Sequence, residues 1–320
     1  MQITIIGMGQ VGASIGLALA KYKDNFTVVG YDKDIQKQNL AKKIGACSKT
    51  YLNLLDAVQS ANLILLAVPY GSLAELFGQI KDEIQPGAVI LTAAPNKKST
   101  TDSFRQLLPG GQIVGLTISF NPDFARVLDP GELIERDDLF QNTTIGISAP
   151  SGTSDSALKY ASDLVTLLGA KVYYLDILEA DGIERSSYLL PQLSAHFALG
   201  ATILQPGWND TRYTVSQPYL NLAAAFGFEP GSELAKVLID EKESNLRMLD
   251  QFLAQASQVK ELLQSGNEAA LATLLDAMLE KKKAVVVART TGNWVEKKET
   301  NDEKSKRGFF RRFFFGDKKQ

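Results

Sequence analysis

The chain has 320 residues, more than one hydrophobic core of ordinary size contains, so we expect two domains or one domain with extensions. Apolar residues make up 45% and charged residues 22% of the chain, a balance typical of folded globular proteins and not of disordered ones. The formal net charge is −2, which predicts no nucleic-acid partner. A single cysteine, Cys47, and a single histidine, His196, exclude an intramolecular disulfide and the common metal clusters, so we expect no metal site.

Targeting signals are not evident in the sequence. Its longest apolar run is far shorter than the roughly 20 residues of a membrane-spanning helix. Met1 leads directly into a strand-like segment without a basic leader. We therefore expect a cytoplasmic protein.

The first 178 residues alternate between short β-branched or apolar runs and amphipathic segments. The predicted strands cover residues 2–6, 27–30, 63–68, 89–92, 112–115, 143–148 and 171–175. The predicted helices between them cover residues 11–20, 35–44, 52–59, 72–84, 100–108 and 154–168. Such alternation predicts an α/β fold with a doubly wound parallel sheet and right-handed crossovers.

The pattern changes after about Leu178. Apolar residues recur at helical spacing over 180–201, 232–263 and 268–288, with no strand-like segment between them. The sequence therefore predicts an α/β domain over 1–178, followed by an all-helical domain over 179–294.

A basic, phenylalanine-rich tail over 295–320 follows the helical domain. Within it, Arg311 and Arg312 separate two phenylalanine clusters, and a helix would place four of the phenylalanines on one face. This pattern predicts contact of residues 306–320 with an anionic membrane surface or a protein partner. A tail without a fixed contact is the alternative.

A glycine-rich element lies directly between the first predicted strand and the first predicted helix. It has the pattern G-x-G-x-x-G and consists of Gly7, Met8, Gly9, Gln10, Val11 and Gly12. The first glycine permits a tight turn, the second lets the backbone approach a pyrophosphate, and the third lets helix and strand pack closely. The helix N-terminus adds free N–H groups and a partial positive charge. The element predicts a Rossmann-type dinucleotide site, although a plain strand-to-helix turn is the alternative.

Asp32 supports the dinucleotide interpretation. It lies at the end of the second predicted strand, 20 residues after Gly12, where a carboxylate can accept both hydroxyls of an adenosine ribose. Its negative charge repels a 2′-phosphate and favours NAD over NADP, although the neighbouring Lys33 weakens that preference. Ala67, Val68 and Pro69 are a second candidate cofactor contact because they follow the buried strand at 63–68. A simple strand stop at Pro69 is the alternative.

With these features in place, the chain resembles the prephenate and arogenate dehydrogenases over about residues 1–290. The resemblance includes Val-Val-Gly-Tyr-Asp at 28–32 and Leu-Ala-Val-Pro at 66–69. In the helical half it includes Gly-Trp-Asn-Asp-Thr-Arg at 207–212, Ser-Gln-Pro at 216–218 and Glu-Ser-Asn at 243–245. The resemblance implies NAD-dependent oxidative decarboxylation of prephenate to 4-hydroxyphenylpyruvate in tyrosine biosynthesis. It also implies a homodimer built through the helical domain.

The resemblance fails at the family's catalytic histidine. Thr117 stands where that histidine is expected, and threonine has no pKa near neutrality with which to hold a proton. The family's serine-containing turn after the preceding strand is also altered, and Asn96 takes the serine position. His196 is a candidate replacement base, although a lone histidine on an apolar helix is more often structural.

Arg212 matches the family's substrate-binding arginine, because a guanidinium can bind a carboxylate through two parallel hydrogen bonds. A surface or interface salt bridge is the alternative role for Arg212. Two hypotheses follow for the whole chain. The first is an NAD-dependent dehydrogenase of prephenate or arogenate, in which Thr117, Asn96 or His196 compensates for the missing histidine. The second is a dinucleotide-binding relative that acts as a sensor or scaffold, or on a changed substrate.

Overall fold

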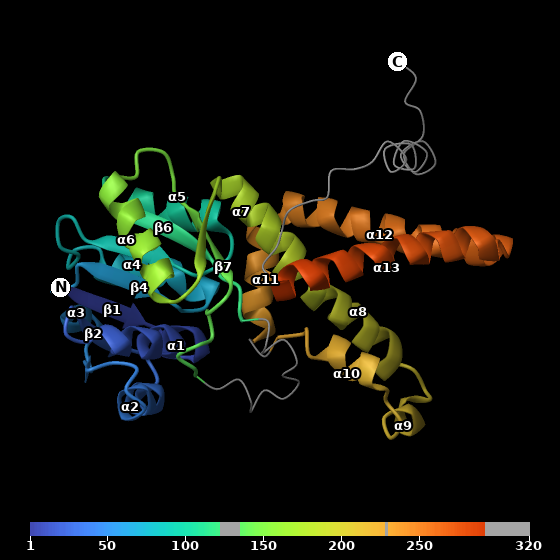
Figure 1. The fold of residues 1–320 in the computed structure, drawn as a ribbon, viewed down its shortest axis with the longest axis horizontal. Coiled ribbons are helices and arrows are strands. Elements are labelled where there is room, and N and C mark those ends of the chain that lie inside the picture. The colour runs from blue at the N-terminus through green and yellow to red at the C-terminus, as the bar shows by residue number, and fades with distance from the viewer. Residues whose placement is uncertain (122–134, 228–229, 292–320) are drawn as a thin grey trace, which may run out of the picture. The chain divides into compact units, whose positions relative to one another are not determined.

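The computed structural model describes residues 1–121, 135–227 and 230–291 (Figure 1). The chain forms two compact units, Met1–Gln258 and Val259–Gln320. The first unit contains the whole sheet, and the second contains α13. The predicted tail over 295–320 lies outside the described residues. No described helix is both long enough and apolar enough to cross a bilayer.

The first unit is built on an eight-stranded sheet with the order β3-β2-β1-β4-β5-β6-β7-β8. Its strands are β1 Gln2–Ile6, β2 Thr27–Tyr31, β3 Lys49–Thr50, β4 Leu63–Leu66, β5 Val89–Thr92, β6 Gln112–Thr117, β7 Thr144–Ser148 and β8 Lys171–Leu175. Every neighbouring pair is parallel except β6 and β7, which are antiparallel. The strand order reverses between β1 and β4, as in doubly wound dinucleotide-binding folds. The predicted fold class is confirmed.

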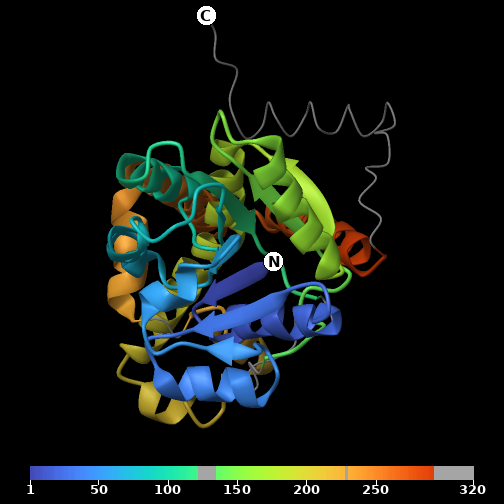
Figure 2. The same cartoon turned by 90° about the vertical axis from the view of Figure 1, so that its left-hand side faces the viewer.

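Helices cover both faces of this sheet (Figures 1 and 2). They are α1 Gln10–Leu19, α2 Ile35–Lys43, α3 Leu54–Val58, α4 Leu73–Ile80, α5 Lys97–Leu107 and α6 Asp155–Leu167. Alternate residues of β4 enter two separate cores: Leu63 and Leu65 pack with α1 and α6, whereas Ile64 and Leu66 pack with α3, α4 and α5. A strand that is buried on both faces needs such a continuous apolar run, and the run at 63–68 predicted this.

The described chain beyond β8 contains helices and no strands. The helices are α7 Ile177–Glu184, α8 Leu190–Ile203, α9 Trp208–Thr211, α10 Gln217–Ala223, α11 Gly231–Asp240, α12 Lys242–Ser265 and α13 Glu268–Thr291. A π-helical turn, Arg185–Leu189, joins α7 to α8. The predicted helix over 232–263 is interrupted at Glu241, between α11 and α12. The domain boundaries at about 178 and 294 stay predictions.

Helix α1 packs so closely on its neighbours that one of its positions accepts only glycine. A Cβ atom on Gly16 would lie 2.0 Å from the carbonyl oxygen of Ala46. Gly78 in α4 is a matched contrast, since a Cβ atom there meets nothing within 4 Å.

We expect Gly16→Ala to lower the free energy of unfolding by about 2–3 kcal/mol, because a backbone carbonyl cannot move aside as a flexible side chain can. Gly78→Ala should raise it by about 0.5–1 kcal/mol through helix propensity. Urea unfolding of both variants measures the difference. Equal effects of the two substitutions would show that α1 is not packed as described.

Candidate active site

The glycine-rich turn adopts the geometry that its sequence predicts. Gly7 has a φ of +93°, and a Cβ atom there would lie 2.3 Å from the carbonyl oxygen of Ala67. A Cβ atom on Gly12 would lie 1.9 Å from the carbonyl oxygen of Gly7. A Cβ atom on Gly9, by contrast, meets nothing within 4 Å. Two glycines therefore close the turn, and the third borders open space.

The N-terminus of α1 faces this open space without a side-chain partner. Its N-cap residue is Gly9, which provides no capping hydrogen bond, and its first turn contains no acidic residue. The first N–H groups of a helix have no partner within the helix and attract anions. The arrangement fits a pyrophosphate group.

Asp32 is fixed beside the same turn. Its carboxylate accepts hydrogen bonds from the backbone N–H of Met8 at 2.8 Å and from that of Asp34 at 2.9 Å. Each oxygen thus receives one backbone donor and keeps capacity for a further one, such as a ribose hydroxyl. Two of the predicted cofactor residues after β4 lie alongside, because a Cβ atom on Gly7 would be closest to the Ala67 carbonyl and the Val68 side chain. The structure places the predicted cofactor residues around one turn, and their role in binding stays a prediction.

Two of the predicted catalytic residues lie at the carboxyl edge of neighbouring strands. Thr117 ends β6, and Asn96 follows β5, which is parallel to β6. Asn96 has a left-handed φ of 54° and is 4% exposed. Its amide nitrogen donates to the carbonyl oxygen of Val237 at 3.0 Å. Asn96 therefore joins the sheet edge to α11.

The other two predicted site residues lie in the helical part. His196 is an exposed residue of α8, and its ring packs 5.7 Å from the ring of Phe226. Arg212 is exposed after α9, and its guanidinium lies 5.0 Å from the ring of Tyr213. Within the described chain, neither contacts Thr117 or Asn96. The roles proposed for His196 and Arg212 stay predictions.

A buried lysine at this sheet edge was not predicted from the sequence. The side chain of Lys97 is fully buried and donates to the carbonyl oxygen of Ala94 and to Oε1 of Glu184, each at 2.5 Å. Gly115 of β6 makes room for it, since a Cβ atom there would lie 2.7 Å from Cδ of Lys97. Burial raises the pKa of Glu184, and the charge and the hydrogen bond of Lys97 oppose that rise.

Asp181 of α7 completes the connection between α5 and α7. Asn96 is the N-cap residue of α5 but makes no side-chain capping bond. The carboxylate of Asp181 replaces it, accepting from the backbone N–H groups of Lys97 at 2.5 Å and Lys98 at 3.2 Å. Burial raises the pKa of Asp181, and these two backbone donors oppose the rise. We refer to Lys97, Asp181 and Glu184 as the α5–α7 joint.

Unpaired polar atoms surround the joint. The hydroxyl oxygens of Thr117 and Ser148 and the second carboxylate oxygen of Glu184 are buried and have no hydrogen-bond partner in the described chain. Ser148 pairs with Gly115 across β6 and β7, so both hydroxyls project from the same face of the sheet. Buried polar atoms of this kind normally bind an ordered water molecule or take part in function. No sequence signal identifies this cluster, because Lys97, Thr117, Ser148 and Glu184 come from four separate elements.

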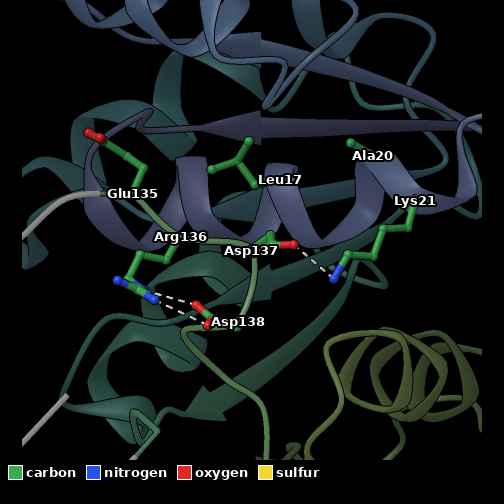
Figure 3. A pocket seen from close by; sticks show the side chains of 7 residues that line it. All are labelled: Leu17, Ala20, Lys21, Glu135, Arg136, Asp137 and Asp138. Carbon is green, nitrogen blue, oxygen red and sulfur yellow. Dashed lines mark hydrogen bonds and ion pairs between the residues drawn. The ribbon is translucent and has the colours of Figure 1, made fainter. Parts of the chain in front are cut away.

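An open hollow lies along the C-terminal half of α1, away from the glycine-rich turn (Figure 3). Four of its charged side chains form two ion pairs: Lys21 contacts Asp137 at 2.9 Å, and Arg136 contacts Asp138 through two hydrogen bonds. Glu135 also lines the hollow and lies outside these two pairs. The described residues contain no group of three or more candidate metal ligands.

Comparison with known proteins identifies the family of the chain. The family model of the prephenate dehydrogenase nucleotide-binding domain matches residues 15–174, half of the chain. The chain is 26% identical to the prephenate dehydrogenase of Lactococcus lactis over 260 residues, which are 78% of this chain and 68% of that protein. It is 22% identical to the cyclohexadienyl dehydrogenase of Zymomonas mobilis, covering 90% of this chain and 96% of that protein.

A solved structure has the same fold. It is a prephenate dehydrogenase from A. aeolicus in complex with hydroxyphenyl propionate and NAD⁺. The TM-score is 0.78 at 17% identity, and the match covers 89% of this chain and 98% of that one.

Two adjacent lysines provide a test of the joint. Lys97→Met should lower the free energy of unfolding by about 3–5 kcal/mol, because it leaves the Glu184 carboxylate buried without its cation. Lys98→Met should lower it by about 0–1 kcal/mol, since Lys98 and its partner Asp102 are each 54% exposed. Chemical denaturation measures both values.

The effect of Lys97→Met should also depend on pH. The raised pKa of Glu184 means that the carboxyl becomes neutral as pH falls, and a neutral carboxyl leaves no charge unpaired. The loss of stability in Lys97→Met should therefore shrink toward acidic pH. A loss that is equal for the two lysines, or constant with pH, would contradict the buried pair.

Proposed function

The chain belongs to the prephenate dehydrogenase family, and from this we propose that it catalyses the NAD-dependent oxidative decarboxylation of prephenate. The observation that carries the proposal is the uncapped N-terminus of α1 over the open space at Gly9, next to the fixed carboxylate of Asp32. These groups fit a pyrophosphate and a ribose diol respectively. The carboxylate disfavours the 2′-phosphate of NADP.

Different residues are proposed to act at the adenosine-diphosphate end and at the nicotinamide end of the cofactor. The glycine-rich turn and Asp32 hold the dinucleotide. When bound, NAD supplies the hydride acceptor at its nicotinamide ring. Thr117 and Asn96 lie at the carboxyl edge of β5 and β6, the edge at which ligands bind in open α/β sheets.

The proposed role of Thr117 is to form a hydrogen bond with the substrate hydroxyl. The resemblance implies that a histidine has this role in the family. A threonine hydroxyl can orient this group but cannot hold its proton at neutral pH. The net reaction does not require release of that proton, since decarboxylation returns electrons to the ring as the hydride leaves. We therefore expect activity that is lower than a histidine would support, by up to the 10²–10⁴-fold that general acid–base catalysis typically provides.

Arogenate is the alternative substrate, because it shares the ring and both carboxylates.

Exposed apolar side chains on α12 and α13 favour a homodimer; they include Leu253, Leu263, Leu275, Met278 and Val287. We further propose a cytoplasmic location, with residues 306–320 contacting a membrane surface or a protein partner.

A coupled measurement tests the proposal. The purified full chain is titrated with NAD by calorimetry, and NAD reduction is then followed with prephenate, with arogenate and with NADP in place of NAD. Binding of NAD with prephenate-dependent reduction is the expected result. Binding of NAD without turnover of either substrate would favour the sensor or scaffold hypothesis.

Gly9→Ala separates cofactor binding from folding. The added Cβ atom meets no protein atom within 4 Å, so thermal stability should be unchanged. Because the methyl group enters the space proposed for the pyrophosphate, the dissociation constant for NAD should rise by about tenfold or more. Calorimetry and a melting curve measure the two effects. Unchanged NAD affinity would show that the pyrophosphate does not bind at this turn.

A further inference from the structure

Arg185 occupies an unusual position in the backbone. It is the first residue of the π-helical turn Arg185–Leu189, and it directly follows Glu184 of the α5–α7 joint. A π-helical turn shifts the direction of the side chains around it and is frequent at functional sites. Arg185 is partly buried. Arg185 therefore lies directly beside the α5–α7 joint.

A buried amide holds the guanidinium in place. Nε of Arg185 donates to Oδ1 of Asn245 at 3.2 Å. Asn245 is 4% exposed, and its own amide nitrogen donates to the carbonyl oxygen of Leu238 at 2.8 Å. The amide oxygen and the amide nitrogen of Asn245 thus each form a hydrogen bond within the protein. The two Nη nitrogens of Arg185 remain for another acceptor.

No described carboxylate forms an ion pair with Arg185. Asp181, four residues earlier on α7, has the spacing of a helical ion pair but instead caps α5. Glu184 is paired with Lys97. Glu241, four residues before Asn245, accepts a hydrogen bond from Ser99 at 2.7 Å. These three acidic side chains each have another partner among the described residues.

We propose that Arg185 binds a carboxylate of the substrate, in addition to the role proposed for Arg212. A partly buried guanidinium that is held by a neutral amide and lacks a counter-ion is suited to an anionic ligand, and its Nη groups match a carboxylate in geometry. The inference rests on the proposed function, whose substrate carries two carboxylates. Nothing in the sequence pattern distinguishes Arg185 from a surface arginine.

Two variants test the proposal, Arg185→Met and Arg185→Lys. Arg185→Met should raise the KM for prephenate by about 10- to 100-fold, the range that a charged hydrogen-bonded pair gives. The affinity for NAD should stay unchanged, and the melting temperature should fall slightly, because Oδ1 of the buried Asn245 loses its donor. Arg185→Lys should restore part of the loss, because it keeps the charge but not the planar fork. Prephenate binding to the NAD-loaded protein, measured by calorimetry, should weaken in parallel.

Arg247→Met is the matched control. Arg247 is an exposed arginine two residues after Asn245, and it contacts only Ser244 among the residues described, at 2.8 Å. Its replacement should leave the KM unchanged. Wild-type protein that turns over prephenate while Arg185→Met has an unchanged KM would overturn the Arg185 proposal alone. Wild-type protein that binds NAD but neither binds nor converts prephenate would overturn the proposed function, and the Arg185 proposal with it.

Discussion

The contact between α5 and α7 is the constraint on which the candidate site depends. The Lys97 side chain is fully buried, and its charge is paired with that of Glu184, which lies 87 residues further along the chain in α7. Asp181, on the same helix as Glu184, caps the N-terminus of α5. A buried ion pair is weak evidence for stability, but separating its partners is expensive, so the two helices are held in one arrangement. That arrangement places α7, and with it Arg185 directly after Glu184, at the carboxyl edge of the sheet.

The nucleotide half of the site follows from a different constraint, which is steric. Gly7 and Gly12 are required because backbone carbonyls lie where their side chains would be, whereas a Cβ atom on Gly9 would meet no described atom within 4 Å. Two of the glycines thus serve the fold, and the third is the one that we propose to lie against the ligand. The open space, the uncapped helix and the fixed Asp32 carboxylate occur together at the point where the strand order reverses. The family assignment agrees with this arrangement.

Local patterns predicted the sheet and the glycine-rich turn well. The strands at 89–92 and 171–175 have the predicted bounds, because short apolar runs between turn residues leave few alternatives. The predicted start of α5, at residue 100, is three residues too late, because the side chain that caps this helix comes from the distant Asp181. The break at Glu241 was missed because apolar spacing continues across it. The α5–α7 joint was missed entirely, since nothing local to Lys97 indicates its partner.

We propose that the substrate ring binds at the carboxyl edge of β6, with its hydroxyl at Thr117 and one carboxylate at Arg185. A crystal structure of the full chain with NAD and hydroxyphenyl propionate, a ligand of the A. aeolicus relative, tests it most directly. We expect electron density for the phenol group within hydrogen-bonding distance of Thr117 and for the carboxylate at an arginine. Density for NAD at the glycine-rich turn with the phenol ring away from Thr117, in crystals saturated with both ligands, would contradict it.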